Sequence, residues 1–132
     1  MKQIMIVDDS LILRVNLKRI LEKQGYQIVA EAADGQEAVE KFMKFRPDLV
    51  TMDITMPVLD GISALQKIRM IDSNACVVMI SAMGQEIKII EAMNNGARNF
   101  IVKPFHENDV IRIIAGILSA DLEKHANVYA AK

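Results

Sequence analysis

The stretches IMIVDDS (residues 4–10) and LVTMDITMP (residues 49–57) both consist of an apolar run that ends abruptly in acid. Asp8 and Asp9 close the first run, and Asp53 closes the second. Short apolar runs of this kind are typical of buried strands, and burying a charge beside them costs free energy unless it is compensated. Three carboxylates at the ends of two core strands therefore indicate a site.

Strand-like runs and helical patterns alternate five times along the chain. The alternation, with four strands almost wholly apolar, predicts a parallel sheet covered by helices on both faces. Right-handed crossovers leave few topologies, and we expect the α/β, flavodoxin-like (βα)5 doubly wound sheet with strand order 2-1-3-4-5. The expected strands are 4–7, 27–32, 49–52, 76–80 and 99–102, and the expected helices are 10–24, 36–44, 61–71, 85–95 and 107 to at least 118.

Length and composition favour one domain with its own core. The chain has 132 residues, 52% of them apolar, and a net charge of −1, so it offers no basic surface for nucleic acid. No apolar run approaches the roughly 20 residues that cross a membrane, and the first residues do not resemble a signal peptide. We expect a cytoplasmic protein that binds neither nucleic acid directly nor membrane.

The domain is expected to span residues 1–119. The alanine-rich tail, residues 120–132, either extends the last helix or frays. The lone Cys76 excludes a disulfide within the chain, and we interpret it as a small core residue.

The carboxyl ends of the strands lie on one edge of a doubly wound sheet, where ligands bind. If the first and third strands are neighbours, Asp8, Asp9 and Asp53 converge there, with Ser81 and Lys103 at the ends of the fourth and fifth strands. Three such carboxylates raise one another's pKa, and a hard cation removes the conflict. Oxygen ligands with open water positions suit Mg²⁺.

Carboxylates, Mg²⁺, the Lys103 amine and the Ser81 hydroxyl together suit a phosphoryl group. We expect Asp53 to be the nucleophile and a metal ligand. Asp9 is expected to bind the metal directly, Asp8 directly or through water, and the Thr55 backbone carbonyl to complete the protein ligands. Simpler roles stay open: Asp9 or Ser10 as a helix cap, Ser81 as a cap of the fourth helix, and Lys103 as an ordinary solvated lysine.

These motifs, taken in order, resemble the receiver domain of two-component response regulators. The resemblance covers residues 2 to about 119 and is carried by the Asp8–Asp9 pair, Asp53 with the following MP..DG, SA at 81–82 and KPF at 103–105. DITMPVLDG and SAMGQ are further similar to the stand-alone chemotaxis regulators of that family. The resemblance implies Mg²⁺-dependent transfer of a phosphoryl group from a sensor histidine kinase to Asp53. It also implies a domain that catalyses its own phosphorylation and dephosphorylation and is not an enzyme in the conventional sense.

The same resemblance assigns further roles. Ser81 corresponds to the switch hydroxyl, Phe100 to the switch aromatic, and the Lys103–Pro104 peptide bond should be cis. Thr55 and Met83 occupy positions that tune the attack of water on the acyl phosphate. Because a thioether cannot orient water well, Met83 predicts a comparatively long-lived phosphoryl group unless a phosphatase inserts its own group.

The fourth helix carries an apolar set too wide for one core stripe, because Ile87 and Ile89 point in very different directions. Together with Phe100 they predict a protein-binding face switched by phosphorylation. The leading partner is a downstream target in chemotaxis, namely the flagellar motor switch. The alternatives are a phosphorelay intermediate and the receiver fragment of a longer, for example transcriptional, regulator.

Two other classes fit the residues poorly. A flavin electron carrier needs a phosphate-cradling loop after the first strand, where this chain has the acidic residues 8–9. A haloacid-dehalogenase-type phosphatase usually places DxD at the end of its first strand. Here Asp53-Ile54-Thr55 ends the third strand and lacks the second acid.

Overall fold

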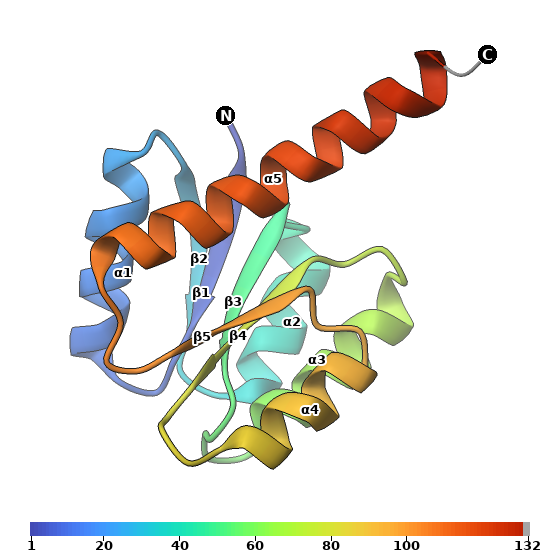
Figure 1. Ribbon diagram of the computed structural model, residues 1–132. Helices are drawn as coiled ribbons and strands as arrows, with labels where there is room; N and C mark the ends of the chain where they lie inside the picture. Colours follow the sequence, from blue (N-terminus) through green and yellow to red (C-terminus); the bar gives the residue numbers. More distant parts are fainter. Residues whose placement is uncertain (131–132) are drawn as a thin grey trace.

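The computed structural model describes residues 1–130, and the side chains of residues 1–119. Its five strands form one parallel sheet in the order β2-β1-β3-β4-β5, which confirms the predicted topology (Figure 1). The elements are β1 (Gln3–Val7), α1 (Leu11–Lys23), β2 (Gln27–Ala32), α2 (Gly35–Phe45), β3 (Leu49–Asp53), α3 (Gly61–Ile71), β4 (Val77–Ser81), α4 (Glu86–Asn94), β5 (Asn99–Val102) and α5 (Glu107–Ala130).

Most boundaries lie within a residue of those expected from the sequence. The main shift is in β4, which begins one residue later than predicted and includes Ser81 as its last residue. Asp53 likewise belongs to β3 instead of following it. The α5 helix continues through residues 120–130. A domain boundary at residue 119 stays a prediction.

Two helical layers cover the sheet. The α1 and α5 helices lie on one face, and α2, α3 and α4 lie on the other (Figure 1). Successive side chains of a strand point to opposite faces, so in β3 Val50 and Met52 join the α2–α3–α4 core while Leu49 joins the α1–α5 core. Cys76 is buried in that second core, as its interpretation as a core residue requires.

Three helices begin at a polar residue that caps them. The side chains of Ser10, Asp34 and Asp60 accept hydrogen bonds from backbone N–H groups in the first turns of α1, α2 and α3. Asp9 is therefore not the cap of α1. The α4 helix differs, because its N-cap residue, Gln85, makes no side-chain capping bond.

The α4 helix is also the least firmly packed of the three helices on its face. Ala92 is its single buried residue, whereas α3 buries five. Burial of apolar surface is the main force that holds a helix on a sheet. The position of α4 therefore depends more than that of α3 on contacts at its ends.

Candidate functional site

The three predicted acids meet at the carboxyl edge of the sheet. Val7 of β1 is in register with Met52 of β3, so the residues that follow, Asp8 and Asp53, lie side by side. One carboxylate oxygen from each of Asp8, Asp9 and Asp53 lies within 4.8 Å of the others. Asp8 and Asp53 are buried, and Asp9 is exposed. The register of a parallel sheet thus assembles the predicted cluster.

Lys103 is ion-paired with two of these acids. Its Nζ lies 3.1 Å from Asp8 Oδ2 and 3.5 Å from Asp53 Oδ1. Its backbone N–H donates to the Ser81 carbonyl oxygen at 2.7 Å, which ties the end of β5 to the end of β4. The alternative of a freely solvated lysine is therefore wrong. The Lys103–Pro104 peptide bond is cis, as expected.

One lysine does not balance three carboxylates. The pKa of Asp53 is raised from 3.8 to about 6, chiefly by burial and then by the charges of Asp8 and Asp9, against the opposing effect of Lys103. In addition, the Lys103 ammonium beside the buried Asp8 Oδ2 is shared with Asp53. Carboxylate oxygens that share one cation in this way fit a further, hard divalent cation. Asp8, Asp9 and Asp53 would hold Mg²⁺, which when bound offsets negative charge on phosphoryl oxygens.

The raised pKa of Asp53 predicts that ionisation of this carboxyl lowers the free energy of unfolding of the metal-free protein. The folded state binds the Asp53 proton more tightly than the unfolded chain, so stability falls as the pH rises from about 4 through 6. Above that window the free-energy cost of keeping the Asp53 carboxyl ionised in the folded protein is at its largest. In EDTA, Asp53→Asn should therefore exceed the wild type in free energy of unfolding at pH 7.5 and lose most of that advantage at pH 4.5.

Urea unfolding of both proteins across this pH range measures the difference. Addition of Mg²⁺ at pH 7.5 should reduce the difference in free energy of unfolding between the two proteins, because the cation stabilises the ionised carboxylates of the wild type. A difference that does not change between pH 4.5 and 7.5 would show that the Asp53 carboxyl is not held in an unfavourable ionised state.

The remaining predicted residues lie around the cluster at different depths. Ser81 is fully buried, and its Oγ has no hydrogen-bond partner within the described residues. Its strand position excludes the role of an α4 cap. Thr55 is exposed in the loop after β3, and Met83 is 76% exposed in the loop after β4. No contact described here tests the metal-binding role of the Thr55 carbonyl, which stays a prediction.

Two polar side chains near the site were not predicted. Arg14 of α1 donates from Nη1 to the Asp8 carbonyl oxygen at 2.6 Å and from Nε to Glu31 Oε1 at 3.2 Å. Gln85 donates to Thr55 Oγ1 at 2.8 Å. Both contacts join segments far apart in the sequence, and no local pattern indicates them.

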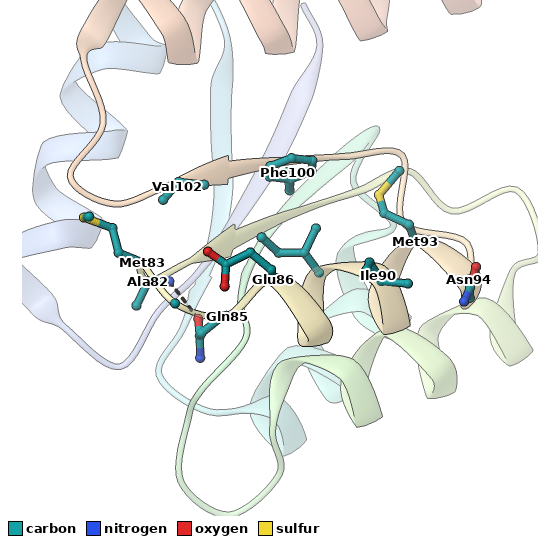
Figure 2. Close-up of a pocket in the computed structure, with 11 residues that line it drawn as sticks. Ala82, Met83, Gln85, Glu86, Ile90, Met93, Asn94, Phe100 and Val102 are labelled. Atoms are coloured by element: carbon teal, nitrogen blue, oxygen red, sulfur yellow. Dashed lines mark hydrogen bonds between the residues drawn. The ribbon is translucent and has the colours of Figure 1, made fainter.

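An apolar groove lies beside the site, between α4 and β5. It encloses about 540 Å³, and Figure 2 shows Phe100 and Val102 of β5 across it from Ile90 and Met93 of α4. Its lining residues are mainly apolar: Ala82, Met83, Gly84, Gln85, Glu86, Ile89, Ile90, Met93, Asn94, Phe100 and Val102.

The residues predicted for the partner face lie in different places relative to the groove. Phe100 lines it and is 37% exposed. Ile89 lines it too but is partly buried against the α2–α3–α4 core. Ile87 is 83% exposed and is not part of the lining. Ile87 and Ile89 thus point in different directions, as expected from a 100° step per residue, and the partner face itself stays a prediction.

Comparison with known proteins agrees with this geometry. The model of the response regulator receiver domain matches residues 4–115. The chain is 52% identical over 112 residues to the chemotaxis protein CheY of Bacillus subtilis (strain 168), covering 85% of this chain and 93% of that protein. It is 40% identical over 113 residues to the transcriptional regulatory protein PdtaR of Mycobacterium tuberculosis (strain CDC 1551 / Oshkosh), covering 86% of this chain and 55% of that protein.

A solved structure shows the same fold. The chain superposes with a TM-score of 0.85 and 40% identity on a chain of the CheX–CheY–BeF₃–Mg²⁺ complex from Borrelia burgdorferi, with 89% of each chain covered. Among the described residues, no helix has the length and apolar character needed to span a bilayer. With the sheet order, the acidic cluster and the Lys103 ion pairs in agreement, the chain belongs to the response regulator receiver domain family.

Proposed function

We propose that the chain accepts a phosphoryl group on Asp53 from a sensor histidine kinase and thereby switches the α4–β5 groove. The observation that carries this proposal is the buried Asp53 carboxylate, ion-paired with Lys103 inside a three-carboxylate cluster. A buried acid with a strongly shifted pKa beside a fixed cation is typical of a reacting group.

In the transfer step, a carboxylate oxygen of Asp53 forms a bond to phosphorus while the bond from phosphorus to the histidine nitrogen of the donor breaks. The electron pair of the broken bond stays on that nitrogen. Lys103 is placed to offset the charge on the phosphoryl oxygens. In a separate hydrolysis step, attack of water on phosphorus breaks the bond to the Asp53 oxygen, releases phosphate and restores the Asp53 carboxylate.

The switch follows from the new charge. The phosphoryl group adds strong acceptor oxygens at the sheet edge, and the unpartnered hydroxyl of Ser81 lies at the neighbouring strand end to donate to one of them. Movement of Ser81 leaves space beside β4. The half-exposed ring of Phe100, on the adjacent β5, then turns inward and changes the groove.

The favoured role is that of a cytoplasmic messenger in chemotaxis. The protein would bind a downstream protein, with the flagellar motor switch as the leading target. The resemblance to CheY proteins over most of their length supports it. A phosphorelay intermediate shares the same chemistry. The match to half of PdtaR supports the second candidate, a receiver within a longer transcriptional regulator. A pull-down with and without beryllofluoride distinguishes these by the partner recovered.

Phosphorylation itself is tested with a small donor. The protein is incubated with acetyl phosphate and Mg²⁺, and its intact mass is followed with time. One phosphoryl group per chain is expected, on the peptide that contains Asp53, and EDTA should prevent its addition. A protein of unchanged mass, or a phosphoryl group on another peptide, would contradict the proposal.

The lifetime of the phosphoryl group is predicted to depend on Met83. Met83 is exposed beside the site and its thioether orients water poorly, so Met83→Asn should speed autodephosphorylation several-fold, on the order of 1 kcal/mol of barrier. Loss of the phosphoryl-protein mass after donor removal gives both rates. Equal or slower decay in the variant would count against this role. Met70→Asn, an exposed methionine on α3, is the matched control.

A further inference from the structure

Gln85 connects two loops that flank Asp53. Its Oε1 accepts a hydrogen bond from the Ala82 backbone N–H at 2.7 Å, and its Nε2 donates to Thr55 Oγ1 at 2.8 Å. The first bond is the dashed line in Figure 2. Thr55 lies two residues after Asp53, and Ala82 directly follows Ser81. A single side chain thus bridges the loop after β3 and the loop after β4.

The position of Gln85 gives this bridge a consequence for α4. Gln85 is the N-cap residue of α4, yet its side chain points back to the two loops and leaves the first turn uncapped. Its carbonyl accepts the Ile89 N–H in that turn, so the backbone of Gln85 belongs to the helix while its side chain belongs to the site. Because α4 buries only Ala92, this attachment is a large part of what places its first turn.

We infer that Gln85 is a positioning residue, a latch that ties the start of α4 to Thr55 and Ala82 in the unphosphorylated state and opposes the switch. This inference rests on the proposed function and adds how the site is linked to the groove. For the Ser81 hydroxyl to approach a phosphoryl group on Asp53, the adjoining Ala82 must move with it. Such movement strains the hydrogen bond from the Ala82 N–H to Gln85 Oε1. The protein therefore has to weaken the latch when Ser81 moves toward the phosphoryl group.

Two substitutions remove the latch from opposite sides. Gln85→Met keeps the length of the side chain without its amide, and Thr55→Val keeps the shape of its partner without the hydroxyl. The matched control is Gln66→Met, because Gln66 Nε2 donates to Asn95 Oδ1 at 3.1 Å and ties the opposite end of α4 to α3. Gln85→Met loses both bonds of the latch, Thr55→Val loses the one to Gln85 Nε2, and Gln66→Met loses one bond away from the site.

Hydrogen exchange without donor or beryllofluoride tests whether the latch holds α4. Exchange of the amides in residues 86–90 should be faster by about fivefold in Thr55→Val, as expected for the loss of one hydrogen bond, and by at least as much in Gln85→Met, which loses two. Exchange there should be unchanged in Gln66→Met. Wild-type exchange rates in both latch variants, or equal acceleration in the control, would overturn the latch.

Beryllofluoride binding in the presence of Mg²⁺ tests the coupling to the site. Each latch variant should bind it about fivefold more tightly than the wild type, because the resting state has lost a contact that opposes the switch. The double variant should bind no more tightly than Gln85→Met alone, since Gln85→Met already removes the bond that Thr55→Val removes. Weaker or unchanged binding, or effects that multiply in the double variant, would overturn the inference.

The two experiments separate this inference from the proposed function. If the wild type does not bind beryllofluoride at all, the proposed function fails and the coupling fails with it. The latch in the resting state is then decided by the exchange rates alone. If the wild type binds and the variants match it in both measurements, the proposed function stands and Gln85 has no positioning role.

Discussion

Asp53→Asn protein is expected to gain no phosphoryl group from acetyl phosphate and Mg²⁺ under conditions in which the wild type gains one. The amide has no anionic oxygen to attack phosphorus, and the carboxylate of the neighbouring Asp8 is fully buried and ion-paired with Lys103. The measurement is the intact mass of both proteins at matched times.

The control for this substitution is Asp60→Asn. Asp60 lies in the same loop, caps α3 through the Ser63 N–H at 2.8 Å, and is replaced by a residue that caps equally well. This variant should be phosphorylated at the wild-type rate. Urea unfolding should show that Asp53→Asn is folded, so that loss of phosphorylation reports on chemistry. A phosphoryl group on folded Asp53→Asn would mean that Asp53 is not the acceptor.

Gly61→Ala is expected to destabilise the protein by about 3 kcal/mol, because a methyl group has no room where α3 begins. A Cβ at Gly61 would overlap the Asp53 carbonyl oxygen and lie 2.9 Å from the Ile54 Cα. The obstacle is backbone, which cannot rotate away as a flexible side chain does. The Gly61 N–H also donates to the Ile54 carbonyl at 2.7 Å, which closes the loop after Asp53.

The matched control is Gly116→Ala in α5, where a Cβ meets nothing within 4 Å. Alanine is the better helix former, so this variant should gain about 0.5–1 kcal/mol. Equilibrium unfolding in urea gives both values. Gly61→Ala should also be phosphorylated more slowly, since the added methyl displaces the Asp53 backbone. A Gly61→Ala protein as stable as the wild type would show that the backbone of the loop after Asp53 can shift to make room for the methyl group with little loss of stability.

The cluster at the sheet edge was predictable because each of its parts follows from a local pattern. Apolar runs define strands, a (βα)5 alternation defines a parallel sheet, and parallel strands end on one edge. These rules alone bring Asp53 next to Asp8 and place Lys103 nearby, as the distances confirm. The resemblance to receiver domains added the cis peptide bond at Lys103–Pro104, which local patterns do not specify.

The groove itself was not predicted. Ile87, Ile89 and Phe100 were expected on a partner face, and that face stays a prediction. Of the α4 side chains named above, Ile89, Ile90 and Met93 line the groove, and Ile87 does not. Helical periodicity separates the faces of a helix but does not indicate which face meets β5.

The sequence by itself determined the sheet and the convergence of three carboxylates with a lysine, because strand order and strand ends follow from short-range patterns. The tertiary structure alone decided the contacts between loops: Gln85 on Thr55, Arg14 on the Asp8 carbonyl, and Gly61 against Asp53. The physical reason is that these contacts join segments that the chain brings together only when the helices pack on the sheet. Hydrogen bonds and close approaches of this kind depend on positions within a fraction of an ångström, which residue spacing does not encode.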